Sequence, residues 1–333
     1  MKNKKNDISL PLNLISKYRA ELMGFAILGV LWGHLMNETW QPVVFSQLAR
    51  LIHTAGFIFL SGFGLYYAFQ KSQNIKLFYQ KRITRILLPF VVITYWFFIV
   101  AFIHGEESIM HFITDITTIS FWIYGEAGSW AMWYVSATIL LYLLFPLLYH
   151  FLFSNRSPIL HLVSTTVLYA IILFAIVTFS PSYWANTRIF WARFIMFPLG
   201  MYAGYLSFKD RKASLLQISI YFFICVILAL ITKLWIDDEL YAVTRTLIGI
   251  PLITIIVHIL SKWQWLRVGI LKPVQFLGIH SYELYLIHVI IYYLCRNIIG
   301  IGSAFSMMIG ISVALLLCKP IHDGINILLQ HKK

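Results

Sequence analysis

The chain has 333 residues, of which 60% are hydrophobic and only 12% are charged. A soluble globular domain carries about 25% charged residues to cover its surface, so this composition excludes that class and indicates an integral membrane protein. The net charge of +13 is consistent with attraction to anionic lipid at the inner membrane surface. The sequence contains no basic domain interleaved with aromatic residues, so no nucleic-acid partner is expected.

About ten apolar stretches have the length needed to cross the ~30 Å hydrocarbon core of a bilayer. Runs such as TILLYLLFPLLYHFLF are apolar on all sides and lack the alternation of transmembrane strands, so we predict an all-α polytopic helix bundle. Connections are short except for about Gly105–Ser129, and residues 1–333 are predicted to form a single membrane domain. The predicted spans are Leu22–Met36, Leu51–Phe69, Ile86–His104, Trp130–Phe153, Ile159–Ser180, Phe190–Phe208, Leu215–Trp235, Leu240–Leu260, Val274–Ile299 and Ser303–Ile321.

The distribution of charge predicts that both termini are cytoplasmic and that the number of spans is even. In this orientation 20 of the 26 Lys and Arg residues lie on the cytoplasmic side: Lys2, Lys4, Lys5, Lys17, Arg19, Lys71, Lys76, Lys81, Arg82, Arg85, Arg156, Lys209, Arg211, Lys212, Lys262, Arg267, Lys272, Lys319, Lys332 and Lys333. The opposite side receives 8 of the 13 acidic residues: Glu38, Glu106, Glu107, Asp115, Glu126, Asp237, Asp238 and Glu239. The first apolar stretch has no small-residue cleavage site, so we predict an uncleaved first helix.

Three cations occur in FYQKRITRILLPF, directly before the third predicted span. Arg82 and Arg85 are three residues apart and share one helix face, with Lys81 beside them. Guanidinium groups bind phosphate through paired hydrogen bonds, which suits a cytosolic phosphorylated ligand. The alternative is that these residues are ordinary positive-inside anchors.

Two histidines lie toward the extracytoplasmic ends of the first two spans. His34 is 15 residues beyond Arg19 (34 − 19), or ~22 Å along a helix. The second span runs back from outside, so His53 can lie at a similar depth. A neutral imidazole there can accept a proton from a hydroxyl as a general base, whereas the simpler interpretation is an interfacial histidine bonded to a neighbour.

The ninth span contains the polar sequence HSYELYLIH. Ser281, Tyr285 and His288 follow at i, i+4 and i+7, which places them on one helical stripe. Glu283 lies within the same span, and an ionisable side chain at membrane depth is expected to face protein or a cavity. The sequence therefore predicts an inward-facing polar stripe.

Arg193 and Trp133 are further candidates at the outer ends of their spans. Arg193 lies on the sixth span and could extend toward the interface or pair with a carboxylate, such as Glu126 or that of a ligand. Trp133 and Tyr134 begin the fourth span, where they belong either to a site or to the interfacial aromatic belt.

No metal site is indicated. Imidazoles at His34, His53 and His288 are possible zinc ligands, but the sequence has no HExxH or Cys/His spacing to support such a site. The three cysteines fall inside predicted spans without a CxxC pattern, where free cysteine behaves as a small apolar residue: Cys225, Cys295 and Cys318.

Six of these stretches, in order, resemble the acyltransferase 3 family of bacterial membrane O-acyltransferases. ELMGFAILGVLWGH resembles the opening motif, with Glu21 and His34 in the matching places, and HTAGFIFLSGFGL resembles the second motif, with His53. FYQKRITRILLPF is similar to the family's basic motif, WAMWYVSATILLYLLFP to its tryptophan helix, RFIMFPLGMYAG to its arginine and glycine helix, and LGIHSYELYLIH to its closing motif. One departure is Gly24, where the family usually has an arginine three residues after the acid; Arg19 lies two residues before Glu21 instead.

The resemblance implies a donor and an acceptor on opposite sides of the membrane. The co-substrate would be cytosolic acyl-CoA, acetyl-CoA in the simplest case, with no bound cofactor. The acceptor would be a hydroxyl of an extracytoplasmic polysaccharide or lipid-linked glycan. The protein would lie in the bacterial inner (cytoplasmic) membrane as a multi-pass protein in contact with lipid, and an extracytoplasmic partner protein could complete the transfer.

The resemblance also implies roles for individual residues. His34 would be the general base, with Glu21 and His53 as further catalytic residues. The acceptor or the oxyanion would be held by Arg193, Trp133, Tyr285 and His288. The phosphates of acyl-CoA would be bound by Lys81, Arg82 and Arg85, and Arg19 is the candidate to replace the arginine missing at Gly24.

Two functions of other classes are alternatives to this enzyme. A transporter or exporter of a polar or lipid-linked solute fits the span count, but the sequence shows no inverted repeats with Gly/Pro-broken helices in both halves. A non-catalytic membrane subunit of a glycan machine would leave the histidines dispensable. A covalent acyl-enzyme at Ser61 or Ser281 lacks the GxSxG turn, and small residues there suit helix packing.

Overall fold

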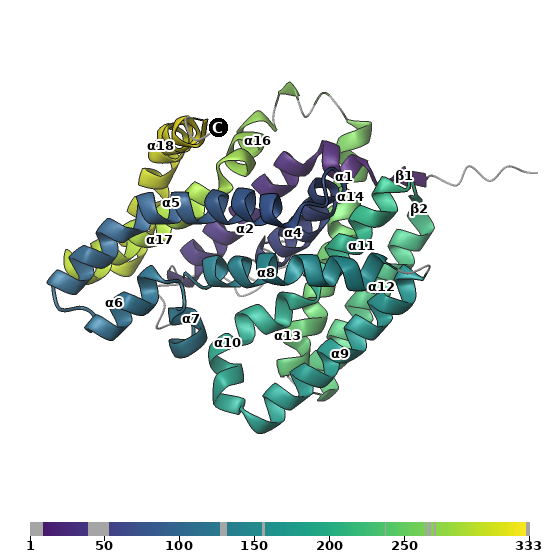
Figure 1. The fold of residues 1–333 in the computed structure, drawn as a ribbon, viewed down its shortest axis with the longest axis horizontal. Coiled ribbons are helices and arrows are strands. Elements are labelled where there is room, and N and C mark those ends of the chain that lie inside the picture. Colours follow the sequence, from purple (N-terminus) through teal and green to yellow (C-terminus); the bar gives the residue numbers. More distant parts are fainter. Residues whose placement is uncertain are drawn as a thin grey trace, which may run out of the picture.

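The structure, a computed structural model, describes residues 9–38, 53–126, 132–154, 157–236, 238–263, 265, 268–269 and 271–330. Nearly all of them are helical (Figure 1), which confirms the all-α class. The helices are α1 (Leu14–Lys17), α2 (Arg19–Glu38), α4 (His53–Gln70), α5 (Ile75–Ile103), α6 (Ile109–Ile116), α7 (Ser120–Tyr124), α8 (Trp133–Phe153), α9 (Pro158–Phe179), α10 (Pro181–Phe194), α11 (Met196–Phe208), α12 (Leu215–Ile231), α13 (Asp238–Leu247), α14 (Gly249–Lys262), α16 (Lys272–Ile279), α17 (Ser281–Tyr293) and α18 (Ser303–Gln330). Two π-helical turns, η2 (Thr232–Ile236) and η3 (Leu294–Ile298), extend α12 and α17.

The membrane-crossing helices can be compared with the expected ten spans by their length and composition. In the described part of the chain, seven helical segments are long and apolar enough to cross a membrane: α5, α8, α9, α10 with α11, α12 with η2, α13 with α14, and α18. A bent pair, α16 with α17 and η3, would be an eighth. Helices α2 and α4 lie where the first two spans were predicted, but neither is among these segments. A multi-pass membrane protein is thus supported, whereas the count of ten and the side on which the termini lie are not confirmed.

The helices differ in how much of their surface the protein covers. Most residues of α4 are buried, from His53 through Phe69. By contrast, only 17% of the apolar window of α9 and 22% of that of α12 and η2 are buried. We infer that α4 is central in the bundle. Helices α9 and α12 present their apolar side chains to lipid, where the hydrocarbon accommodates them.

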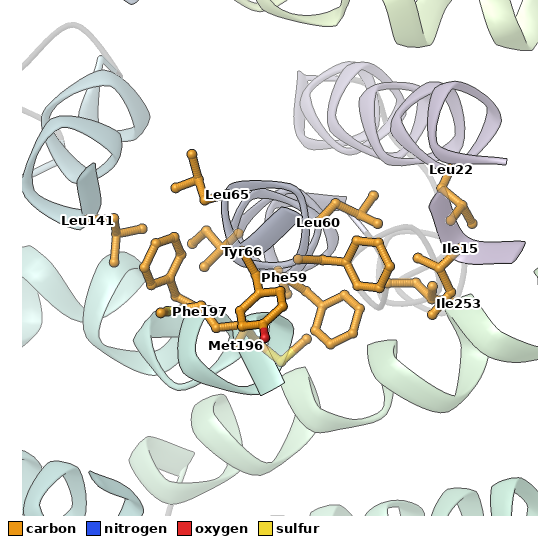
Figure 2. Close-up of a cluster of buried hydrophobic side chains, with 14 of the residues drawn as sticks. Ile15, Leu22, Phe59, Leu60, Leu65, Tyr66, Leu141, Met196, Phe197 and Ile253 are labelled. Atoms are coloured by element: carbon orange, nitrogen blue, oxygen red, sulfur yellow. The ribbon is translucent and has the colours of Figure 1, made fainter. Parts of the chain in front are cut away.

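The main hydrophobic core forms where α4 and α11 approach each other at glycines. A Cβ atom at Gly62 would lie 2.3 Å from the carbonyl oxygen of Phe197, and one at Gly200 would lie 2.1 Å from that of Phe59. Only glycine permits this backbone contact. Figure 2 shows side chains of α1, α2, α4, α8, α11 and α14 that fill this core: Ile15, Leu22, Phe59, Leu60, Leu65, Tyr66, Leu141, Met196, Phe197 and Ile253.

The segment before α2 is part of the folded protein. Strand β1 (Ser9–Pro11) pairs antiparallel with strand β2 (Lys212–Ser214), which lies between α11 and α12. Leu10, Ile15 and Tyr18 are buried in the main core. These contacts fix the start of α2 against α11 and α14.

The long connection predicted at about residues 105–129 contains two short helices, α6 and α7, before the described residues stop at 126. Ser108 begins α6, because its side-chain oxygen accepts a hydrogen bond from the N–H of His111 at 3.2 Å. The ring of His111 contacts that of Tyr124 in α7, with 3.9 Å between ring centroids. This segment was expected to be a loop, and local capping and ring packing make it helical instead.

The ninth predicted span is not one straight helix. Helices α16 and α17 meet at His280 with an angle of 75° between their axes. The Nδ1 of His280 lies 2.8 Å from the carbonyl oxygen of Phe276, and its ring lies 4.4 Å from the Phe276 ring. These contacts hold the His280 ring against the last turn of α16, and α17 continues from there in a new direction.

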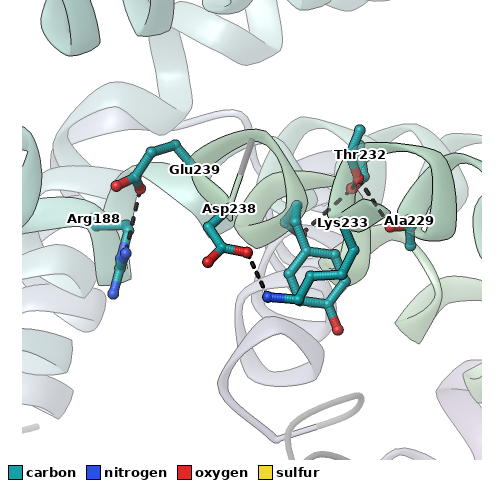
Figure 3. Close-up of polar contacts among 8 residues, drawn as sticks. Arg188, Ala229, Thr232, Lys233, Asp238 and Glu239 are labelled. Carbon is teal, nitrogen blue, oxygen red and sulfur yellow. Dashed lines mark hydrogen bonds and ion pairs between the residues drawn. The ribbon is translucent and has the colours of Figure 1, made fainter. Parts of the chain in front are cut away.

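A group of polar contacts joins α10, η2 and α13 (Figure 3). Arg188 and Glu239 form an ion pair at 3.3 Å, and the indole N–H of Trp184 donates to the same carboxylate at 2.6 Å. Lys233 pairs with Asp238 at 2.5 Å. Both ion pairs are partly exposed, so each contributes ~0–1 kcal/mol.

Candidate active site

Helix α2 carries three of the predicted site residues at its two ends. Arg19 and Glu21 lie in the first turn, and His34 lies in the last turns. Glu21 is fully buried, and a carboxylate is favoured at this position because the first turn of a helix carries partial positive charge. Arg19 and His34 therefore sit ~22 Å apart along one helix.

The ring of His34 contacts the ring of His288 in α17. Their centroids are 5.3 Å apart and the rings meet edge to face. His288 is fully buried, and its Nδ1 lies 2.8 Å from the carbonyl oxygen of Leu284. Because a carbonyl only accepts, Nδ1 carries the hydrogen, and Nε2 of a neutral His288 is left as an acceptor. Within the described residues, this Nε2 has no hydrogen-bond partner.

A continuous row of aromatic contacts leads from the histidine pair to Arg193. The ring of His288 lies 6.1 Å from that of Tyr285, which lies 5.5 Å from that of Tyr134 in α8. Tyr134 is 5.8 Å from the neighbouring Trp133, and the guanidinium carbon of Arg193 stands 5.9 Å from the Trp133 ring. The structure thus links His34 to four of the predicted site residues in one row. Tyr134 lies in the middle of this row, which contains His288, Tyr285, Trp133 and Arg193.

Arg193 is buried and does not extend toward the interface. Only 8% of it is exposed. Its Nη1 donates to the carbonyl oxygen of Ile189 at 2.6 Å. A guanidinium over the face of Trp133 gains a cation–π attraction that is larger in a desolvated place. The protein thus holds a positive charge at this end of the aromatic row.

His53 begins α4 and is also buried, at 8% exposed. Its Nδ1 lies 2.5 Å from the side-chain oxygen of Thr54. Contact between His53 and His34 remains a prediction, whereas the contact between His34 and His288 is established. Ser61, about two turns further along α4, forms a hydrogen bond with the hydroxyl of Tyr134 and so lies beside the aromatic row.

At the other end of α2, Arg19 lies close to the basic motif of α5. Arg82 and Arg85 both act electrostatically on Arg19, as does Tyr142 of α8. A Cβ atom at Gly64 of α4 would lie 3.3 Å from both Nε and Nη2 of Arg19, so the guanidinium rests on this glycine. Arg82 is half-buried, whereas Lys81 and Arg85 are exposed.

These arginines bring like charges together, and among the described residues no acidic side chain forms an ion pair with Arg19, Arg82 or Arg85. The buried Nε of Arg19 has no hydrogen-bond partner there. Like charges that converge repel each other, and an anion between them would relieve that repulsion.

Two contacts between helices support the site, and the sequence analysis did not single out either of them. Gly310 of α18 faces His288: a Cβ atom there would lie 2.6 Å from the carbonyl oxygen of His288. The hydroxyl of Tyr282 donates to the carbonyl oxygen of Ile86 at 3.0 Å, which ties α17 to α5 beside Arg85. Such contacts depend on helix packing and leave no local pattern in the sequence.

The described residues contain no group of three or more His, Cys, Asp or Glu side chains arranged to hold a metal ion. The three cysteines are free and buried, in agreement with their interpretation as small apolar residues.

The bundle of apolar helices and the contact between half-buried His34 and buried His288 define a multi-pass membrane protein with a polar site in its interior. A family model described as an acyltransferase domain matches residues 22–321. The chain therefore belongs to the acyltransferase 3 family, as its motifs predicted. Neither the curated proteins nor the solved structures include a match to this chain.

Proposed function

We propose that this membrane acyltransferase moves an acyl group, most simply acetyl, from cytosolic acyl-CoA to a hydroxyl of an extracytoplasmic or lipid-linked glycan. The observation that carries the proposal is the arrangement along α2. The His34–His288 pair lies at one end of the helix, and the three arginines converge at the other. A donor with phosphates at one end and a thioester at the other fits this arrangement, because the phosphates would bind at the arginines and the thioester would lie at the histidines.

In the proposed reaction, His34 accepts the proton of the acceptor hydroxyl as its oxygen attacks the thioester carbonyl. The C–O bond forms, the tetrahedral intermediate collapses, and the C–S bond breaks. The thiolate of coenzyme A then takes the proton from the imidazolium of His34. No external oxidant, reductant or metal is needed, and the products are an ester and free thiol.

The neighbours of His34 supply orientation and charge in this scheme. His288 presents the unprotonated Nε2, which can accept a hydrogen bond from one ring nitrogen of His34, while the other ring nitrogen of His34 accepts the proton. Arg193, desolvated against Trp133, would stabilise the oxyanion of the intermediate. Glu21 in the first turn of α2 and His53 at the start of α4 are proposed to support the helix ends at which they lie.

Arg19, Arg82 and Arg85 would hold the phosphates of the donor, with Lys81 at the rim. Three guanidinium groups without a carboxylate partner in the described ranges favour a multiply charged anion. Arg19 would take the part of the arginine that is absent at Gly24. Gly24 itself cannot carry a long side chain toward α16, since a Cβ atom there would lie 1.9 Å from the carbonyl oxygen of Val274.

The test is release of free thiol when purified protein is incubated with acetyl-CoA, with and without a glycan acceptor. Thiol release that depends on the acceptor and is accompanied by an acetylated glycan supports the proposal. Acceptor-stimulated uptake of the glycan into vesicles without thiol release would identify a transporter instead. No thiol release with any glycan, from protein that is folded by its melting transition, would reject the enzymatic proposal.

A further inference from the structure

Two helix pairs carry the two histidines of the site. Helix α2, with His34, packs against α16 so closely that a Cβ atom at Gly278 would lie 1.8 Å from the carbonyl oxygen of Ala20. Helix α17, with His288, packs against α18 through the contact at Gly310. Backbones in contact at glycines leave little freedom for either pair to slide, since close packing tolerates few voids.

The chain passes from the first pair to the second at an elbow, and α2 also packs directly against α17 and α18. Helices α16 and α17 meet at His280, and the angle between them is 75°. Because His34 lies on the first pair and His288 on the second, a change in the angle of this elbow would change the distance between the two rings. A small rotation at the elbow is amplified along α17, where His288 lies two turns beyond it.

A cluster of three side chains stands at the elbow. The Oε1 of Glu283 in α17 lies 2.8 Å from Nδ1 of His322 in α18. The ring of His322 lies 4.9 Å from the ring of His280, edge to face. Glu283 and His280 are buried, at 4% and 5% exposed. The cluster therefore touches the elbow, α17 and α18 at once.

We propose that His280, Glu283 and His322 form a brace that fixes the α16–α17 elbow and so holds His288 against His34. The three are positioning residues, and their role in acyl transfer rests on the proposed function. None of them needs to reach the donor or the acceptor. A buried carboxylate without its partner is costly, which makes Glu283–His322 a strict constraint on the position of α18.

The neighbouring charged residues of α18 pair with each other and not with the brace. Lys319 and Asp323 of α18 pair with each other at 2.9 Å and are more than half exposed. An exposed pair four residues apart contributes little to stability. The change Asp323→Asn is therefore a matched control, because it removes a charge next to His322 without removing a contact of the brace.

The kinetic test compares Glu283→Ala with Glu283→Gln, which keeps an acceptor for the Nδ1–H of His322. We expect Glu283→Ala to lower kcat by ~10- to 100-fold with KM for acetyl-CoA unchanged, because a displacement of the order of 1 Å at the reacting groups is enough for such a loss. Glu283→Gln should recover most of the activity, and Asp323→Asn should resemble the wild type. If Glu283→Ala does not fold, His322→Leu against His322→Asn repeats the comparison at a partly exposed position.

A second measurement does not depend on activity. In a cysteine-free background, His34→Cys with His288→Cys is treated with a short bifunctional thiol reagent, with and without the brace substitution. Slower cross-linking in the Glu283→Ala background, restored by Glu283→Gln, supports the brace even if the wild type transfers no acyl group. Unchanged cross-linking and unchanged kcat per folded molecule, with only a lower melting temperature, would overturn it, as would a rise in KM alone.

Discussion

At the scale of single residues, substitution of His34 tests the proposed chemistry most directly. We expect His34→Ala to lower the turnover per folded molecule by a factor of roughly 10²–10⁴, the usual contribution of a general base. Binding of acetyl-CoA should stay nearly unchanged, because the phosphates are held at the other end of α2. The measurement is acceptor-dependent thiol release normalised to the folded fraction.

His104→Ala is the control for that substitution, because this histidine follows α5 and is exposed. A histidine with a purely structural role would behave differently from a base: yield and melting temperature would fall while activity per folded molecule persisted. Activity of His34→Ala within twofold of the wild type removes His34 from the mechanism.

The arginine cluster makes a separate prediction about affinity. Replacing Arg82 and Arg85 by alanine removes two charge-assisted contacts of ~1.5–3 kcal/mol each, so binding of coenzyme A should weaken by about 10-fold or more for each. Arg19→Ala should add to this loss, because its guanidinium lies in the same field. A pantetheine fragment without the nucleotide phosphates should bind all variants alike.

Lys76→Ala provides the matched control for the arginines, since Lys76 is exposed in the first turn of the same helix. Equal loss of affinity for coenzyme A and for the fragment would point to a damaged fold. No loss for either would leave the cations as topological anchors.

At the scale of helices, the close approach of α18 to α17 predicts the effect of a single methyl group. Gly310→Ala would place a Cβ atom 2.6 Å from the carbonyl oxygen of His288 and 3.3 Å from the N of Tyr292. Such overpacking typically costs ~1–3 kcal/mol. We expect a lower melting temperature together with lower activity per folded molecule, because the backbone that moves carries His288.

The same helix offers the comparison. Gly324 lies on α18 with no atom within 4 Å of an added Cβ atom, so Gly324→Ala should be neutral or slightly stabilising. Similar losses in the two variants would mean that helix propensity, and not contact with α17, accounts for the effect.

The helices also show which sequence patterns were informative. The apolar stretches predicted the positions of most helices, since lipid requires backbone polar groups to be satisfied within each helix. Where side-chain contacts shape an element, the pattern was insufficient. Hydropathy records neither the contact of His280 with Phe276 at the elbow nor the contact of His111 with Tyr124 between α6 and α7.

For the whole molecule, orientation in the membrane is the property to test. Basic residues near span ends predict that the turn before α5 is cytoplasmic. Ser72 and Gln73 in this turn are exposed, so Ser72→Cys should resist an impermeant thiol reagent applied to intact cells. Glu106→Cys, at the other end of α5, should react. The native cysteines are buried and should contribute little background.

Labelling of Ser72→Cys from outside, with Glu106→Cys protected, would invert the predicted orientation. The proposed donor site at the arginines would then face away from cytosolic acyl-CoA. Reaction of both positions only after permeabilisation would show that the end of α5 at Glu106 is not exposed outside.

The sequence by itself determined the class of protein, because a chain with so few charges cannot cover a soluble surface and must place its apolar helices in lipid. Its ordered motifs predicted the family and the residues of the site. Tertiary structure alone decided which of them meet. His288 contacts His34, Arg19 lies in the electrostatic field of Arg82 and Arg85, and an elbow joins α17, the helix of His288, to α16, which packs against the helix of His34. These contacts join residues far apart in the chain, and helix packing at glycines sets them, which no local pattern specifies.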